Sequence, residues 1–212
     1  MESLTSLIKA FWKLALAGGV YLLKSNCSQV LGIDLGSNRV KFANENIEQN
    51  YPHLISKLAF KCESLASLKV SNKFDVIVSK DTFEHIQNLE EVLEKIKVAL
   101  KPGGRLFAGF GPLYHSVYGD HKVTRPLFPW FHLVFPESFL LKRINKGRTS
   151  PVKNIRSIGL NKLAFEDYMK IFQNSGLNIV YFETNQSDSF FVKILSLKKY
   201  STQSIYIILE KN

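Results

Sequence analysis

Runs of apolar residues alternate along the chain with amphipathic segments, and this alternation predicts strands and helices in turn. Strands are predicted over residues 30–34, 58–62, 75–79, 105–110, 177–184 and 205–210. Helices are predicted, from apolar residues at helical spacing, over residues 4–25, 38–49, 89–100 and 164–174. Strands that alternate with helices are typical of a parallel sheet with helices on both faces, so the predicted fold class is α/β.

The stretch from Phe74 to Phe110 contains the clearest strand-helix-strand unit. One face of its helix carries the apolar residues Leu89, Val92, Leu93, Ile96 and Leu100. Pro102 cannot continue this helix, and the two glycines that follow permit a sharp return into the next strand. We therefore expect one parallel crossover unit here.

Residues 111–161 form an insertion that follows this unit and shows no clear periodicity. About fifty residues is long for a connection, and loops of this length often bind substrates or cover a site. No repeat or linker divides the chain. We predict one domain over residues 1–212, with residues 111–161 as a substrate lid.

The composition is that of a globular protein, because 212 residues with 45% hydrophobic residues can form one full core. The two cysteines, Cys27 and Cys62, have neither metal-ligand spacing nor a disulfide framework. We predict two buried thiols, no structural zinc and a cytoplasmic location.

The net charge of +10 raises the question of an anionic partner. Basic residues are spread along the chain except for one cluster: Lys142, Arg143, Lys146, Arg148, Lys153 and Arg156. No zinc finger, helix-turn-helix or ribonucleoprotein pattern accompanies them, so we expect a solvated surface and no specific nucleic-acid partner.

Within the first 23 residues, the apolar positions between Leu4 and Leu16 are interrupted by Lys9 and Lys13, and the run is too short to span a bilayer. Their spacing predicts an amphipathic helix. A helix that packs on the sheet is favoured over one that lies on a membrane surface through Phe11 and Trp12.

The sequences of two segments resemble those of the class I S-adenosylmethionine-dependent methyltransferases that act on small molecules. Phe-Asp-Val-Ile-Val and Asp-Thr-Phe-Glu-His, over residues 74–85, are similar to that family's fourth strand, and Leu-Lys-Pro-Gly-Gly-Arg-Leu to the entry into its fifth. The resemblance implies a Rossmann-like three-layer sandwich. It also implies a mostly parallel sheet that ends in an antiparallel strand pair, with the last strand inserted between its neighbours.

The resemblance also implies a cofactor site for S-adenosyl-L-methionine. Asp34, at the end of the strand over residues 30–34, is similar to the family's acid that accepts hydrogen bonds from the ribose hydroxyls. A carboxylate at the end of a buried parallel strand suits a nucleoside diol on chemical grounds as well, although it could instead cap a helix or lie in a solvated turn. Glu63 corresponds to an acid near the adenine, and the other predicted contacts are Leu35, Cys62, Ser79, Gly18 and Gly19.

The amino terminus departs from the family pattern, which has a first strand and a glycine-rich loop. Only Gly18 and Gly19 remain at the expected distance before Asp34. We favour a shortened or degenerate member without the first strand, for which an in-frame glycine-rich strand upstream of the start codon would indicate a misplaced start. The alternative is that residues 7–16 take the place of that strand.

Residues 111–121 concentrate polar side chains after the carboxyl end of a central strand, where this topology holds substrates. Methyl transfer to a hydroxyl requires removal of a proton, and His115 and His121 are the predicted bases. Tyr114, Trp130 and His132 are predicted to line the acceptor. The alternative is that the histidines only fasten the lid.

A metal is not predicted, because the ligand types present show no known spacing: His115, His121, His132, Asp120 and Glu137. Glu84 and His85 recur in the family beside the cofactor, where they are expected to shape the pocket and cap the following helix. The resulting prediction is a methyltransferase for a small-molecule or glycan-like acceptor. Its rival is a non-catalytic, methyltransferase-like binding or scaffolding protein.

Overall fold

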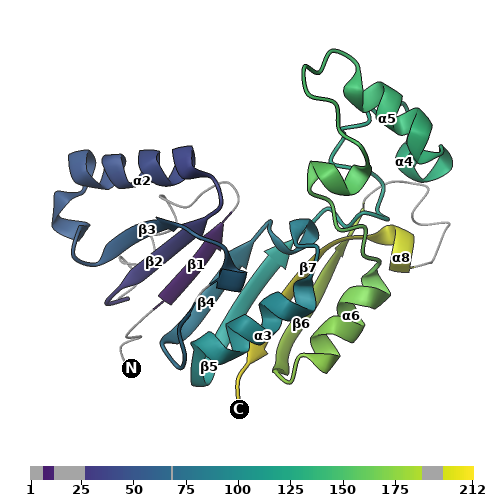
Figure 1. Cartoon of the computed structure of the whole chain (residues 1–212). Coiled ribbons are helices and arrows are strands. Elements are labelled where there is room, and N and C mark those ends of the chain that lie inside the picture. The colour runs from purple at the N-terminus through teal and green to yellow at the C-terminus, as the bar shows by residue number, and fades with distance from the viewer. Residues whose placement is uncertain (1–6, 12–26, 68, 188–197) are drawn as a thin grey trace.

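The computed structural model describes residues 7–11, 27–67, 69–187 and 198–212. Its centre is a seven-stranded sheet with the strand order β3-β2-β1-β4-β5-β7-β6 (Figure 1). The strands are β1 (Leu7–Phe11), β2 (Val30–Asp34), β3 (Leu58–Cys62), β4 (Phe74–Lys80), β5 (Leu100–Phe110), β6 (Asn178–Gln186) and β7 (Thr202–Glu210). The helices are α2 (Ser37–Asn50), α3 (Leu89–Ala99), α4 (Phe131–Val134), α5 (Glu137–Asn145), α6 (Phe165–Asn174) and α8 (Lys198–Ser201). Short 3-10 turns are η1 (Pro52–Leu54), η2 (Leu65–Ser67), η3 (Phe83–His85) and η4 (Ile155–Ile158).

Residues 7–11 form β1, which lies parallel to β2 and β4 in the middle of the sheet; Ile8 pairs with Leu31 on one side and with Ile77 on the other. The prediction of an absent first strand is therefore wrong, and so is the predicted helix over residues 4–25 where it covers β1. The alternative, in which this segment takes the place of the strand, is confirmed for residues 7–11. Residues 7–11 form a strand and not a helix because the facing edges of β2 and β4 need backbone hydrogen-bond partners in the sheet interior. The rest of the predicted helix, including Gly18 and Gly19, lies outside the described residues.

Helices cover the two faces of the sheet in separate clusters, because neighbouring residues of a strand point to opposite faces. Val76 of β4 packs with α2, while the next residue, Ile77, packs in the larger cluster with α3 and α6. Figure 1 shows α3 and α6 over the half of the sheet that contains β4 to β6, and α2 over the half with β3. The predicted three-layer α/β sandwich is confirmed.

The carboxyl-terminal half of the sheet is antiparallel. β7 pairs with β5 on one side and with β6 on the other, both in the antiparallel sense. The predicted insertion of the last strand between its neighbours is therefore confirmed. β5 begins earlier than expected, at Leu100, because the Pro-Gly-Gly turn is absorbed into the strand at an irregularity opposite Phe74.

Cys27 is buried as predicted, but Cys62 is exposed. Cys62 is the last residue of β3, which is an edge strand of the sheet. None of the helices in the described ranges combines the length and the apolar character that crossing a bilayer requires.

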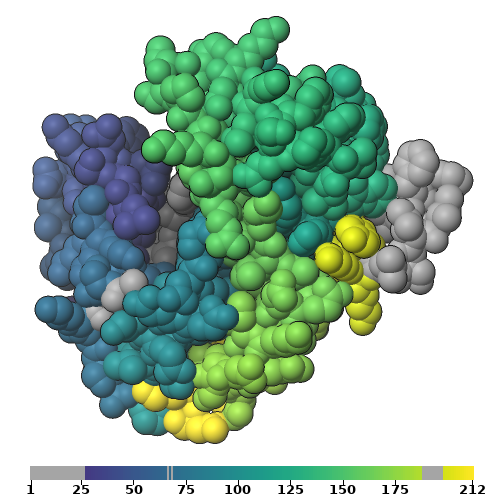
Figure 2. All heavy atoms as spheres, turned by 45° about the vertical axis from the view of Figure 1, so that its right-hand side comes forward, coloured from purple at the N-terminus to yellow at the C-terminus, as the bar shows by residue number. Residues whose placement is uncertain are grey.

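The inserted segment 111–161 contains α4, α5 and η4, which the sequence did not predict. Its buried residues form a small cluster of their own: Tyr114, Phe131, Leu140, Ile144, Ile155 and Leu160. In Figure 2 the segment forms a raised lobe at the top of the view. Apolar residues that show no sustained periodicity in the sequence can therefore still form a core, here through short helices joined by turns.

Candidate functional site

A pocket of about 330 Å³ opens at the carboxyl ends of β2, β3 and β4. Asp34 and Leu35 line it from the end of β2, and Glu63 lines it from the end of β3. Thr82 and His85 contribute the side that follows β4, and the first turn of α3 closes the remaining wall. Three of the predicted cofactor residues, Asp34, Leu35 and Glu63, are thus brought together around one cavity.

Asp34 has a nearly buried carboxylate, with 8% of the residue exposed. Its Oδ1 accepts a hydrogen bond of 2.7 Å from the backbone N–H of Gly36. Arg39, in the first turns of α2, also pairs with it: Nη2 lies 2.5 Å from Oδ1, and Nε lies 3.0 Å from Oδ2. This ion pair was not predicted, since a cation near a helix start is usually solvated and carries no signal in the sequence.

The other predicted cofactor residues do not line this pocket or are not described by the structure. The thiol of Cys62 contacts the carbonyl oxygen of Leu35 at 3.6 Å and does not line the cavity. Ser79 is buried in β4 and lines a neighbouring cavity formed mainly with β5 and β7. Gly18 and Gly19 lie outside the described residues.

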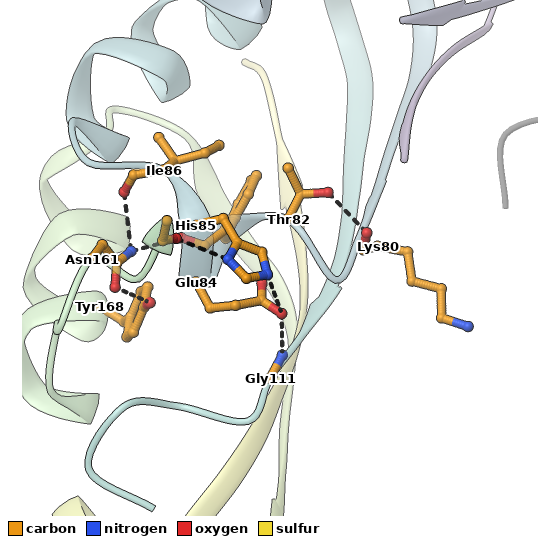
Figure 3. Close-up of polar contacts among 10 residues, drawn as sticks. Lys80, Thr82, Glu84, His85, Ile86, Gly111, Asn161 and Tyr168 are labelled. Carbon is orange, nitrogen blue, oxygen red and sulfur yellow. Dashed lines mark hydrogen bonds and ion pairs between the residues drawn. The ribbon is translucent and has the colours of Figure 1, made fainter. Parts of the chain in front are cut away.

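The turn η3 after β4 is fixed by buried polar contacts (Figure 3). The side-chain amide of Asn161 donates to the carbonyl oxygens of Phe83 and Ile86, at 2.7 and 3.0 Å, and its Oδ1 accepts from the Tyr168 hydroxyl at 3.0 Å. The sequence analysis missed Asn161, because an isolated asparagine in a loop has no pattern that identifies its partners. The predicted cap of α3 is wrong as well, since Asn88 accepts from the N–H of Glu91 and caps that helix.

Glu84, within η3, is 2% exposed, and its Oε1 accepts a hydrogen bond of 3.2 Å from the backbone N–H of Gly111. Burial raises the pKa of its carboxyl to about 8. The next residue, His85, places Nδ1 2.8 Å from the carbonyl oxygen of Gly159. These contacts hold η3 against both ends of the inserted segment.

The inserted segment separates the two predicted bases. His121 has its ring centroid 5.1 Å from that of His85, a residue of the pocket wall. His115 lies elsewhere, with its ring against Tyr114 and 6.3 Å from the ring of Tyr200. Burial lowers the pKa of His115, so its imidazole is neutral at neutral pH.

Two of the predicted acceptor residues are packed inside the insert. His132 is 3% exposed and its Nε2 lies 2.6 Å from the carbonyl oxygen of Tyr114, which is 6% exposed. Burial lowers the pKa of His132 and raises that of Tyr114 to about 12, so both side chains are neutral. Trp130 is half-buried and donates its indole N–H to the carbonyl oxygen of Tyr200 at 3.3 Å. Tyr114 and His132 therefore pack inside the insert and do not form an open surface for an acceptor.

The strand order, with the last strand β7 antiparallel to β5, defines a Rossmann-like fold. A family model described as a methyltransferase domain matches residues 16–106. The match covers less than half of the 212 residues, and over that part the chain is similar to class I S-adenosylmethionine-dependent methyltransferases.

Individual relatives are similar over part of their length. A malonyl-[acyl-carrier protein] O-methyltransferase of Priestia megaterium is 27% identical over 121 residues, which are 52% of this chain and 42% of the relative. Phosphoethanolamine N-methyltransferase 2 of Caenorhabditis elegans is 32% identical over 94 residues, 44% of this chain and 20% of the relative. The chain therefore matches less than half the length of either relative.

A solved S-adenosylmethionine-dependent methyltransferase from Methanosarcina mazei superimposes with a TM-score of 0.62. The match covers 100% of this chain and 94% of that chain at 15% sequence identity. At this identity the likeness concerns the fold alone.

Proposed function

We propose that this chain binds S-adenosyl-L-methionine in the pocket beside Asp34 and transfers its methyl group to a small-molecule or glycan-like acceptor. The observation that carries the proposal is the position of the Asp34 carboxylate, at the carboxyl end of β2 and in the wall of the cavity. In an open α/β sheet this is where a nucleoside is held, and a carboxylate offers two oxygens to a vicinal diol.

The residues around the pocket fit the cofactor's nucleoside half. A cavity of about 330 Å³ is within the range of small-ligand sites. Glu63 stands beside Asp34, because its backbone N–H donates to the Asp34 carbonyl oxygen at 3.2 Å. Its carboxylate can accept a hydrogen bond from an exocyclic amine. The cofactor itself supplies an electrophilic methyl group on a sulfonium.

Arg39 is the one neighbour that competes for the same carboxylate. Its side chain is 49% exposed, so it can turn into solvent when a diol binds. The exposed guanidinium is hydrated again when it turns away, and the hydroxyls of the bound diol donate to the carboxylate in its place. Binding of the ribose would replace the guanidinium on Asp34 without opening the core.

On the acceptor side, the protein's task is to align the acceptor in line with the methyl group and to accept a proton when the acceptor is a hydroxyl. His121 and His115 remain the two candidates for this base. His121 is supported by its contact with His85 in the pocket wall, and His115 by a lowered pKa that keeps it neutral. The names of the two relatives above specify different acceptors, so neither acceptor is assigned to this chain.

The rival proposal, a scaffolding protein without catalysis, was based on the loss of the first strand. β1 occupies the central position between β2 and β4, so the absence of a first strand can no longer be used as an argument for the rival. No other observation on the described residues favours the rival.

Calorimetric titration with S-adenosylhomocysteine, comparing wild type with Asp34→Ala, tests the proposed site. Loss of two hydrogen bonds to a charged acceptor is expected to weaken binding by about 10- to 100-fold. Glu48→Ala, which removes an exposed acid from the opposite end of α2, is the matched control and is expected to bind like wild type. Equal affinities of wild type and Asp34→Ala would refute the proposal.

A further inference from the structure

Three potential metal ligands meet at the junction between η3 and the inserted segment. They are Glu84, His85 and His121, and their ligand atoms all lie within 4.8 Å of one another. The first two follow β4, while His121 comes from the insert, so the sequence gives no ligand spacing. Of these three residues, only His121 was among the candidate metal ligands considered in the sequence analysis.

Glu84 contributes a carboxylate that the rest of the protein satisfies only in part. Its Oε1 accepts from the N–H of Gly111, but Oε2 is buried and has no hydrogen-bond partner among the described residues. A buried carboxylate oxygen is costly to leave without a partner. A cation at this oxygen would remove that cost.

His85 is held in the orientation typical of a metal ligand. A carbonyl oxygen can only accept, so Nδ1, 2.8 Å from the Gly159 carbonyl oxygen, carries the ring proton. The lone pair is therefore on Nε2, which faces Glu84 with a separation of 4.0 Å from Oε1 (Figure 3). Metal-binding histidines commonly donate their other N–H to a backbone carbonyl in this way.

His121 is positioned by the turn in which it lies. Its backbone has a φ of 54°, and its N–H donates to the Tyr118 carbonyl oxygen at 3.0 Å. The preceding residue, Asp120, is fully buried and accepts from the N–H groups of Lys122 and Thr124, both at 3.1 Å. This turn presents the imidazole of His121 beside that of His85.

The ligand atoms are somewhat farther apart than the ligands of one bound ion. Nε2 of His85 and Oε1 of Glu84 are too far apart at 4.0 Å for a hydrogen bond. Ligands about 2.1 Å from a tetrahedral ion are about 3.4 Å from one another. Adjustments of roughly an ångström would bring the three groups onto a common ion.

We propose that Glu84, Nε2 of His85 and an imidazole nitrogen of His121 bind one divalent transition-metal ion, with zinc as the probe of choice. Two imidazoles and one carboxylate form a ligand set used by zinc and by non-haem iron, with positions left for water or another oxygen ligand. The ion would join the insert to the pocket wall, since His85 belongs to that wall. With His121 on the metal, His115 is the remaining candidate for the base.

This proposal goes beyond methyl transfer, and it is tested by metal binding without a turnover assay. Chelator-treated protein is titrated with Zn²⁺ by calorimetry, using wild type, His85→Ala and His121→Asn. Asparagine suits the left-handed backbone at position 121, so the turn is retained. His53→Ala, which removes an exposed histidine in η1, is the matched control.

We expect one Zn²⁺ per wild-type chain, bound at least about 100-fold more tightly than by either ligand variant, with His53→Ala like wild type. Co²⁺ added to the wild type should give visible absorption bands of a site with nitrogen and oxygen ligands. Mg²⁺ should compete poorly, because it prefers oxygen ligands. Zinc binding no tighter than millimolar, or equal binding by wild type and both ligand variants, would overturn the proposal. Thermal unfolding in chelator, with similar midpoints for the four proteins, separates loss of the site from loss of the fold.

Discussion

The guanidinium of Arg39 pairs with the carboxylate of Asp34, with 2.5 Å between Nη2 and Oδ1. The two residues are joined because β2 ends at Asp34 and α2 begins three residues later, which brings the first turns of the helix over the end of the strand. The group proposed to hold a ribose therefore already has a cationic partner. Arg39 acts as a competitor that a bound diol must displace.

Replacing Arg39 with alanine should strengthen the binding of S-adenosylhomocysteine. The pair has one exposed partner, so its loss is expected to raise affinity by about 3- to 5-fold, as measured by calorimetry. Lys41→Ala, which removes an exposed cation from the same helix, is the control and should leave the affinity unchanged. Weaker binding by Arg39→Ala would mean that the guanidinium orients Asp34 and does not compete with the ribose.

The turn of the insert depends on Asp120, which is 0% exposed and accepts from the hydroxyl of Thr124 as well as from two backbone N–H groups. Asp120→Ala leaves these buried donors without their acceptor. The free energy of unfolding should fall by about 2–4 kcal/mol in urea denaturation. Glu48→Ala, at an exposed position, should change it by less than about 0.5 kcal/mol. A similarly small effect of Asp120→Ala would show that the turn forms without this carboxylate.

The buried carboxyl of Glu84 makes the metal-free protein less stable as the pH rises. Its pKa is about 8 in the folded protein and about 4.3 in an unfolded chain, so between these values the folded state holds the proton more tightly. The free energy of unfolding then decreases with rising pH across this window. Glu84→Gln lacks the titration and can still accept from the N–H of Gly111.

Wild type and Glu84→Gln are compared by urea unfolding in chelator at pH 5.5 and pH 8. Relative to wild type, the variant should gain about 2 kcal/mol of unfolding free energy between pH 5.5 and pH 8. A difference between the two proteins that does not change with pH would show that Glu84 is ionised in the folded state throughout.

The strands β2 and β3 could be predicted to the residue because each is a short apolar run between polar turns. β1 could not, since its five residues, Leu-Ile-Lys-Ala-Phe, fit a helix as well as a strand. The choice is made by the pairing edges of β2 and β4, which are distant in the sequence. A short apolar segment therefore takes its structure from the sheet around it.

The sequence could predict that Asp34 and Glu63 lie beside one pocket, because each follows the end of a neighbouring parallel strand. It could not be predicted where side chains meet across the insert. Tyr114 and His132 turn inward onto each other, whereas His121 approaches His85, and these contacts depend on turns such as that of Asp120. Such turns leave no periodic signal in the sequence. Of the Glu84-His85 pair, which was expected to shape the pocket, only His85 lines it.

The central claim, that this chain binds a methyl-donor nucleoside at the end of β2, is tested most directly by titrating the wild-type protein with S-adenosylhomocysteine in a calorimeter. The account predicts one molecule per chain with a dissociation constant in the micromolar range, accompanied by a rise in the thermal unfolding midpoint. Affinity no better than millimolar, with an unchanged midpoint, would contradict it.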